Sequence, residues 1–281
     1  MLRISKNYFT FPFYIPRIYR LWSNWPEYLV NYVLRRNIPA EYQMRNGARL
    51  VDSQGDLAGT LAVVFVRREY GPLAGFRTIV DVGANMGSFA LYAAQCCPDA
   101  KIYCFEPEQR TFVTLKRNID MNGLQGRVLV FQRAIASQAG PRDMSVIESL
   151  RSSFHISAEG AGCQTVQCVT LTDILSDPEI EIIDLLKLNC EGAEHEILEA
   201  CTPAEFDRIA NIRLEYHNLE SPARTGKSLA RLLEHRGYRI ERFTRYLNTS
   251  GFIWAARTLV SVKFWVICFA ESMARELGPI V

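Results

Sequence analysis

The chain contains 281 residues, of which 48% are hydrophobic and 22% are charged, and its formal net charge is +2. This composition allows an ordinary buried core and either one large α/β domain with an appendage or two small domains. The small net charge provides no basic field that would favour nucleic acid as a partner. Eight cysteines occur without a C-x-x-C pair or a matching histidine spacing, which disfavours a zinc site or a disulfide framework and predicts a cytoplasmic protein.

Residues 1–77 are predicted to form a small N-terminal α/β cap. The first 23 residues are aromatic and basic, and Pro12 and Pro16 interrupt any apolar core of a signal peptide. Packing of this stretch on its own domain is favoured over contact with a membrane surface or a partner. The cap is expected to contain a helix over 25–36, a hairpin around Asn46-Gly47 and a second helix over 59–68.

The stretch 78–90 has the pattern of a buried strand, a tight turn and a helix. The apolar run reaches Asp81, glycines follow at Gly83 and Gly87, and apolar residues then recur at helical spacing. Glycines let the backbone approach a ligand, and a helix start offers unpaired N–H groups. Neither G-x-G-x-x-G nor G-x-x-x-x-G-K-[ST] is present, which disfavours a nicotinamide oxidoreductase and a phosphate-binding loop. The acid fits a cationic ligand with an amino group and a sulfonium, and a purely structural turn is the alternative.

Two further strands are predicted to complete this half of the domain. Lys101–Phe105 ends at Glu106, 25 residues after Asp81, where a carboxylate can accept two hydroxyl hydrogen bonds from a ribose. A third strand over 128–131 precedes Ala134-Ile135, which suits a flat adenine face or simply a strand leaving the core. Residues 138–165 are expected to form an antiparallel excursion or loop over the site.

The second half of the domain begins with an apolar strand, Asp184–Cys190. This strand delivers Asn189, Cys190 and Glu191 to its carboxyl end, where open parallel sheets bind ligands. Glu191 and His195 are four residues apart, which predicts a shared helix face on which they pair or ligate a metal. The alternative is that the acids of this stretch favour a helix N-terminus.

A later strand over 211–217 places Glu215 and His217 on the same side by strand alternation. A histidine at a strand end beside a site is a candidate general base, because its pKa lies near working pH. A structural role is the alternative for His217.

Together these motifs resemble the FkbM family of S-adenosylmethionine-dependent methyltransferases, class I enzymes whose first motif matches D-x-G-x-x-x-G. The similarity covers roughly residues 45–257. It is carried by Val80–Ser88, Phe105–Pro107, Asn118 with Asn122–Leu124, Arg133–Ala136, Asp184–Glu194 and Leu214–His217.

The resemblance implies a Rossmann-like α/β domain over 78–257, with a mostly parallel seven-stranded sheet and helices on both faces. It also implies transfer of a methyl group from S-adenosylmethionine to a hydroxyl of a glycan, glycolipid or natural product. The residues expected to bind this cofactor are Asp81, Gly83, Ala84, Asn85, Gly87, Ser88, Glu106, Pro107, Ala134 and Ile135.

One position departs from the family, which usually has Asp where this chain has Asn189. An amide removes a candidate metal ligand or base, although its oxygen still accepts hydrogen bonds. No metal ligands are therefore predicted, and a divalent metal is without support. The candidate catalytic residues are His217, Glu191 and Asn189. The alternative function is a non-catalytic S-adenosylmethionine-binding or membrane-associated accessory protein.

Residues 258–281 form a third segment, which begins with an unusually apolar stretch over 258–270. This stretch falls short of the roughly 20 residues that a membrane-spanning helix needs. It is predicted to be an apolar C-terminal helix that is buried or that forms a homodimer interface. Peripheral membrane contact, shared with the aromatic N-terminus, is the alternative.

Overall fold

A computed structural model of the chain describes residues 11–34, 38–55, 57–146, 154–155, 163–219, 221, 223–246 and 249–257. The first ten residues and the predicted apolar helix over 258–281 lie outside these ranges. Among the described helices, none combines the length and apolar character needed to cross a bilayer.

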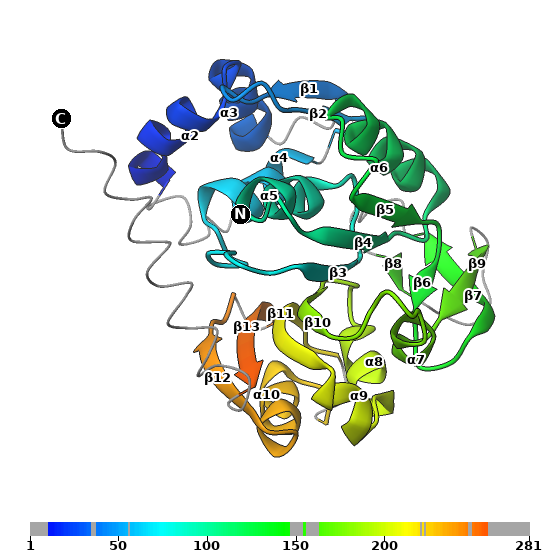
Figure 1. Ribbon diagram of the computed structural model, residues 1–281. Helices are drawn as coiled ribbons and strands as arrows, with labels where there is room; N and C mark the ends of the chain where they lie inside the picture. The colour runs from blue at the N-terminus through cyan, green and yellow to red at the C-terminus, as the bar shows by residue number, and fades with distance from the viewer. Residues whose placement is uncertain are drawn as a thin grey trace.

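A seven-stranded sheet runs through the centre of the molecule in the order β12-β13-β11-β10-β3-β4-β5 (Figure 1). Five adjacent strands, β11, β10, β3, β4 and β5, are parallel to one another, whereas β13 is antiparallel to both β11 and β12. This arrangement confirms the predicted mostly parallel sheet. The bounds are β3 Thr78–Val82, β4 Lys101–Phe105, β5 Val128–Phe131, β10 Ile183–Leu188, β11 Ile209–His217, β12 Tyr238–Phe243 and β13 Ser250–Arg257.

Helices cover both faces of this sheet, as expected (Figure 1). Because side chains alternate along a strand, Ile79 of β3 packs into the core on one face and Val80 into the core on the other. The first face carries α5 and α6, and the second carries α7 to α10. The bounds are α5 Ser88–Cys96, α6 Gln109–Met121, α7 Leu171–Leu175, α8 Glu194–Ala200, α9 Pro203–Asp207 and α10 Gly226–His235.

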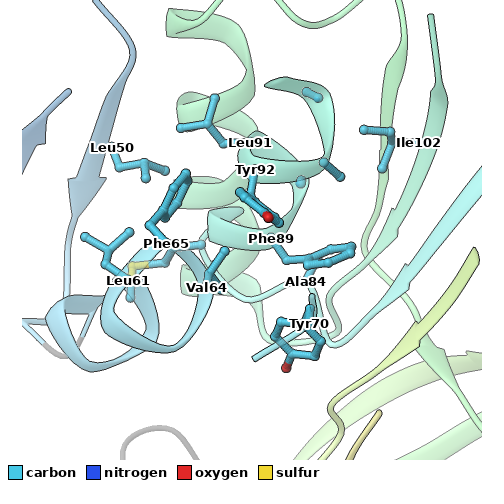
Figure 2. Close-up of a cluster of buried hydrophobic side chains, with 14 of the residues drawn as sticks. Leu50, Leu61, Val64, Phe65, Tyr70, Ala84, Phe89, Leu91, Tyr92 and Ile102 are labelled. Carbon is cyan, nitrogen blue, oxygen red and sulfur yellow. The ribbon is translucent and has the colours of Figure 1, made fainter. Parts of the chain in front are cut away.

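The N-terminal elements pack against α5 as an outer layer. Trp22 is fully buried and stacks on Tyr28 with their ring centroids 5.4 Å apart, so the described part of the aromatic segment packs on its own domain. Figure 2 shows Phe65 from this layer in the same apolar cluster as Phe89 and Tyr92 of α5. The elements are η1 Phe11–Tyr14, α2 Ile15–Leu21, α3 Trp25–Leu34, β1 Ala40–Gln43, β2 Arg49–Asp52, α4 Leu57–Leu61 and the π-helical turn η2 Ala62–Val66.

The predicted hairpin is present, because β1 pairs with β2 antiparallel around Asn46-Gly47. The second predicted helix starts two residues early, at Leu57. Asp52 is fully buried and its carboxylate accepts the backbone N–H groups of Gly55 and Leu57 at 2.6 and 2.9 Å. This carboxylate satisfies N–H groups that a helix start leaves unpaired, and therefore fixes where the helix begins.

The expected antiparallel excursion after β5 is a small second sheet in the order β6-β9-β7-β8. Arg142 of β7 pairs with Glu196 of α8 at 3.1 Å, which fastens this sheet to the central domain. Glu196 therefore has a specific partner in addition to its favourable place at a helix N-terminus. The bounds are β6 Ala134–Ile135, β7 Gly140–Val146, β8 Phe154–His155 and β9 Cys163–Val169.

The chain reverses its direction of travel across the sheet between β3 and β10. From β3 it proceeds outward to β4 and β5, and it then returns to β10 on the other side of β3. In open α/β sheets such a reversal leaves a crevice at the carboxyl ends of the two strands. The motifs of both halves follow these two strand ends.

Candidate active site

The turn after β3 is shaped by residues with positive φ, with values of +71° at Gly83, +50° at Asn85 and +90° at Gly87. A Cβ at Gly83 would lie 1.9 Å from the backbone oxygen of Asn189, so only glycine allows the turn to cross the end of β10 there. The N–H groups of Gly83 and Ala84 both donate to the carbonyl of Phe105 at 3.0 Å. The turn is therefore anchored on both neighbouring strands.

Glu106 lies directly against this turn. Its Oε2 accepts the N–H of Asn85 at 2.9 Å, and its Oε1 accepts the N–H of Glu108 at 3.0 Å. Burial raises the pKa of Glu106 to about 7, although the two backbone hydrogen bonds oppose this shift. Each carboxylate oxygen can accept a second hydrogen bond, so Glu106 retains capacity for a ligand hydroxyl.

Asn118 of α6 holds the same turn from beneath. Its amide donates to the carbonyl of Met86 at 2.8 Å and exchanges hydrogen bonds with the backbone of Val51 in β2, at 2.7 and 3.0 Å. Asn122, one helical turn later, exchanges a similar pair with Arg49 at 3.0 and 2.7 Å. These two asparagines belong to the motif that carries the family resemblance, and their role is to clamp the hairpin and the turn to α6.

Asp81 pairs with Lys187, a residue that the sequence did not single out. Strand register places them side by side, and Lys187 Nζ lies 2.7 Å from Asp81 Oδ1 with both side chains almost completely buried. Lys187 also donates to the carbonyl of Gly83 at 2.7 Å. Burial raises the pKa of Asp81, and the Lys187 ammonium opposes that shift. The only available signal was one lysine in an otherwise apolar strand.

Two buried polar atoms of the turn region have no hydrogen-bond partner among the described residues. They are Oδ2 of Asp81 and the hydroxyl Oγ of Ser88. Buried polar atoms are normally satisfied, so each is a position where a polar group of a ligand would be stabilised. These two atoms and Glu106 fit a ligand that carries both an amino group and hydroxyls.

The end of β10 lies beside the end of β11. The N–H of Asn189 donates to the carbonyl of Val82 at 3.1 Å, and its side-chain Nδ2 donates to Glu215 Oε2 at 3.1 Å. Burial raises the pKa of Glu215 to about 7, with His217 opposing the shift and Glu191 adding to it. Asn189 Oδ1 is buried and has no donor among the described residues.

His217 lies between two carboxylates. Its Nδ1 is 3.3 Å from Glu194 Oε1 and its Nε2 is 3.4 Å from Glu191 Oε2. Burial alone would lower the pKa of His217, but the hydrogen bond to Glu194 and the negative charges of Glu194, Glu191 and Glu215 raise it to about 9. Both ring nitrogens therefore carry protons at neutral pH.

The predicted pairing of Glu191 with His195 on one helix face is wrong. Helix α8 begins only at Glu194, and Glu191 has a left-handed backbone with φ +55°. The buried Glu194 carboxylate accepts the N–H groups of Cys190 and Gly192 at 2.7 and 2.9 Å, which folds this segment into a loop. His195 instead contacts the carbonyl of His217 at 3.2 Å. Within the described part of the chain, no group of three or more His, Cys, Asp or Glu side chains could hold a metal ion.

Comparison with known proteins identifies the family. The model of the methyltransferase FkbM domain matches residues 81–240, more than half of the chain. This chain belongs to the FkbM methyltransferase family. The FkbM-family match begins at Asp81 and contains both strand-end motifs, which confirms the resemblance to this family of S-adenosylmethionine-dependent methyltransferases.

Individual relatives of this FkbM-family chain are 27–29% identical to it over the residues that align. Methyltransferase sdnD of Sordaria araneosa is 29% identical over 58% of this chain and 74% of its own length. The 31-O-demethyl-FK506 methyltransferase FkbM of Streptomyces tacrolimicus is 28% identical over 50% of this chain and 66% of its own length. The hexuronic acid methyltransferase AglP of Haloferax volcanii is 27% identical over 53% of this chain and 60% of its own length.

The structure of this FkbM-family chain brings most of the expected cofactor residues together. The turn from Asp81 to Ser88 contacts Glu106, and Pro107 follows directly at the tip of β4. Ala134 and Ile135 form the buried strand β6, and Ile135 packs in the same apolar cluster as Phe105. The contact of Ala134 and Ile135 with an adenine stays a prediction.

Proposed function

We propose that this chain is an O-methyltransferase that transfers a methyl group from S-adenosylmethionine to a hydroxyl of a glycan, glycolipid or natural product. Two relatives support this acceptor class, since one is named for 31-O-demethyl-FK506 and the other for hexuronic acid. Both acceptors offer hydroxyl oxygen as a nucleophile.

The observation that carries the proposal is the presence of two acidic side chains, Glu106 and Glu215, along one edge of the sheet. Glu106 lies against the glycine turn after β3, while Glu215 lies beside Asn189 at the ends of β10 and β11. The first group suits a ribose and the second suits a hydroxyl that must lose a proton.

The residues of the turn fit the cofactor. Asp81 Oδ2 and Ser88 Oγ would satisfy its amino acid portion, and Glu106 would accept its ribose hydroxyls. When bound, S-adenosylmethionine supplies an electrophilic methyl group on a positively charged sulfur. The contribution of this chain is to hold an acceptor hydroxyl in line with that methyl and to exclude water.

The test incubates the purified chain with methyl-labelled S-adenosylmethionine and with glucuronic or galacturonic acid as hydroxyl-bearing probes. We expect a labelled methyl ether and an equal amount of S-adenosylhomocysteine. A methyl ester on the probe carboxylate would be lost in mild alkali, whereas an ether survives. Cofactor binding without acceptor-dependent turnover on hydroxyl probes would contradict O-methylation and support the accessory-protein alternative.

A further inference from the structure

A row of three residues crosses the carboxyl ends of three neighbouring strands: Gly83 follows β3, Asn189 follows β10 and Glu215 lies near the end of β11. Register pairs Lys187 with Asp81 on one side and with Arg213 on the other, so Asn189 comes to lie between Gly83 and Glu215 two residues later. The contacts agree, because Asn189 touches the Gly83 position through its backbone and Glu215 through its side chain. Glu215 therefore lies one strand beyond Asn189 in a row that begins at the glycine turn after β3.

We propose that Glu215 is the group that accepts the proton of the acceptor hydroxyl, and that Asn189 and His217 are its positioning residues. This inference rests on the proposed O-methyltransferase function.

The hydrogen bond from Asn189 favours the deprotonated form of Glu215, which is the form that can accept a proton. An amide N–H that donates to Oε2 stabilises the carboxylate form. The aspartate that the family usually carries here would put two carboxylates side by side, and such a pair shares a proton. Because this chain has Asn189 instead, Glu215 shares no proton with a carboxylate at that position and carries the negative charge alone.

His217 is held in the protonated state by Glu194 and Glu191, so it has no free lone pair with which to remove a proton. Its positive charge instead stabilises the carboxylate of Glu215. The charged and titratable groups around Glu215 are Lys187, Glu191, Glu194 and His217, together with the hydroxyl of Tyr70.

Tyr70 shields the site on its apolar side. Its ring packs edge-on against Phe89 and Phe252, with centroid distances of 5.1 and 5.3 Å. Figure 2 shows its hydroxyl pointing out of the apolar cluster. The Tyr70 hydroxyl interacts with Asn189 and Glu215, so this aromatic group reduces the contact of the half-buried Glu215 carboxylate with water and favours its protonated form.

The acceptor oxygen forms a bond to the methyl carbon while the methyl–sulfur bond breaks and its electron pair remains on sulfur. The hydroxyl proton passes to an oxygen of Glu215. The products are a methyl ether, neutral S-adenosylhomocysteine and a protonated Glu215, which then releases its proton to solvent.

The test compares Glu215→Gln with Glu199→Gln, which makes the same chemical change at an exposed ion pair on α8. With glucuronic acid as the probe, Glu215→Gln should lower kcat by about 100-fold or more, the usual contribution of a general base. Binding of S-adenosylhomocysteine should be unchanged in both variants. The rate of the wild type should rise with pH through an apparent pKa near 7, and Glu215→Gln should lose that rise.

Asn189→Asp tests the positioning role, since a second carboxylate should move the midpoint of the pH profile upward. Carbon-13 labelling of glutamate gives a readout without any acceptor, because the signal missing from Glu215→Gln should titrate near pH 7. Full activity and an unchanged pH profile in Glu215→Gln would overturn the assignment while leaving O-methylation intact. Titration of Glu215 at the ordinary value of about 4.3 would also overturn it. Absence of cofactor binding in the wild type would instead refute the proposed function.

Discussion

The ammonium of Lys187 and the carboxylate of Asp81 form an ion pair of 2.7 Å in which neither side chain has appreciable contact with solvent. Removing one partner of such a pair leaves a buried charge without compensation, which typically costs about 3–5 kcal/mol. We therefore expect Lys187→Met to lower the free energy of unfolding by that amount in urea titrations.

The double variant Asp81→Leu/Lys187→Met provides the control, because it removes both charges together. It should be more stable than Lys187→Met alone. If the two substitutions instead destabilise additively, the charges are not coupled and the pair does not organise this edge of the sheet.

Glycine is required at residue 83 for a steric reason that Gly123 does not share. Both have positive φ, +71° and +66°, but a Cβ at Gly123 would contact nothing within 4 Å. Gly123→Ala should therefore cost about 1 kcal/mol from backbone strain alone. Gly83→Ala should cost several times more, because β3 and β10 must separate. Equal losses for the two variants in chemical denaturation would show that the contact with Asn189 is unimportant.

Asn118 and Asn122 make similar clamps on β2, but only Asn118 also holds the carbonyl of Met86. Hydrogen exchange should therefore separate the two alanine variants. Asn118→Ala is expected to increase exchange in both β2 and the turn over 83–88, whereas Asn122→Ala should increase it in β2 only. Unchanged turn protection in Asn118→Ala would contradict the assigned role of this asparagine.

His217 should make stability depend on pH. Its pKa is raised to about 9 in the folded protein from an ordinary value near 6.5, so the folded state binds the proton more tightly. The resulting contribution, about 3 kcal/mol, is complete below the unfolded pKa and is lost as the pH rises through 9. The wild type should exceed His217→Gln in stability at pH 6.5 and lose that advantage by pH 10. An advantage that persists at pH 10 would exclude a protonated His217.

Much of the fold could be read from local patterns. Apolar runs ending at Asp81, Glu106 and Asn189 predicted strands whose carboxyl ends meet, and the structure places all three ends at one edge of the sheet. The contact between Glu106 and the glycine turn follows from that topology alone, because adjacent parallel strands end side by side.

Other features needed information that local patterns lack. The partner of Lys187 depends on strand register, and Tyr70 reaches the site from a segment that precedes the main domain. The prediction that Glu191 and His195 share a helix face required a helix that had already begun at Glu191, but α8 begins at Glu194. The buried Glu194 carboxylate delays that start, and Glu191 turns to His217 instead.

The most direct test of the central claim is a calorimetric titration of S-adenosylhomocysteine into the wild type and into Glu106→Ala. We expect one binding site in the wild type and at least about tenfold weaker binding in the variant, since the ribose loses a charged hydrogen-bond acceptor. Glu199→Gln should bind like the wild type. Absence of binding to the wild type, or equal affinity in Glu106→Ala, would contradict the cofactor site at the turn after β3.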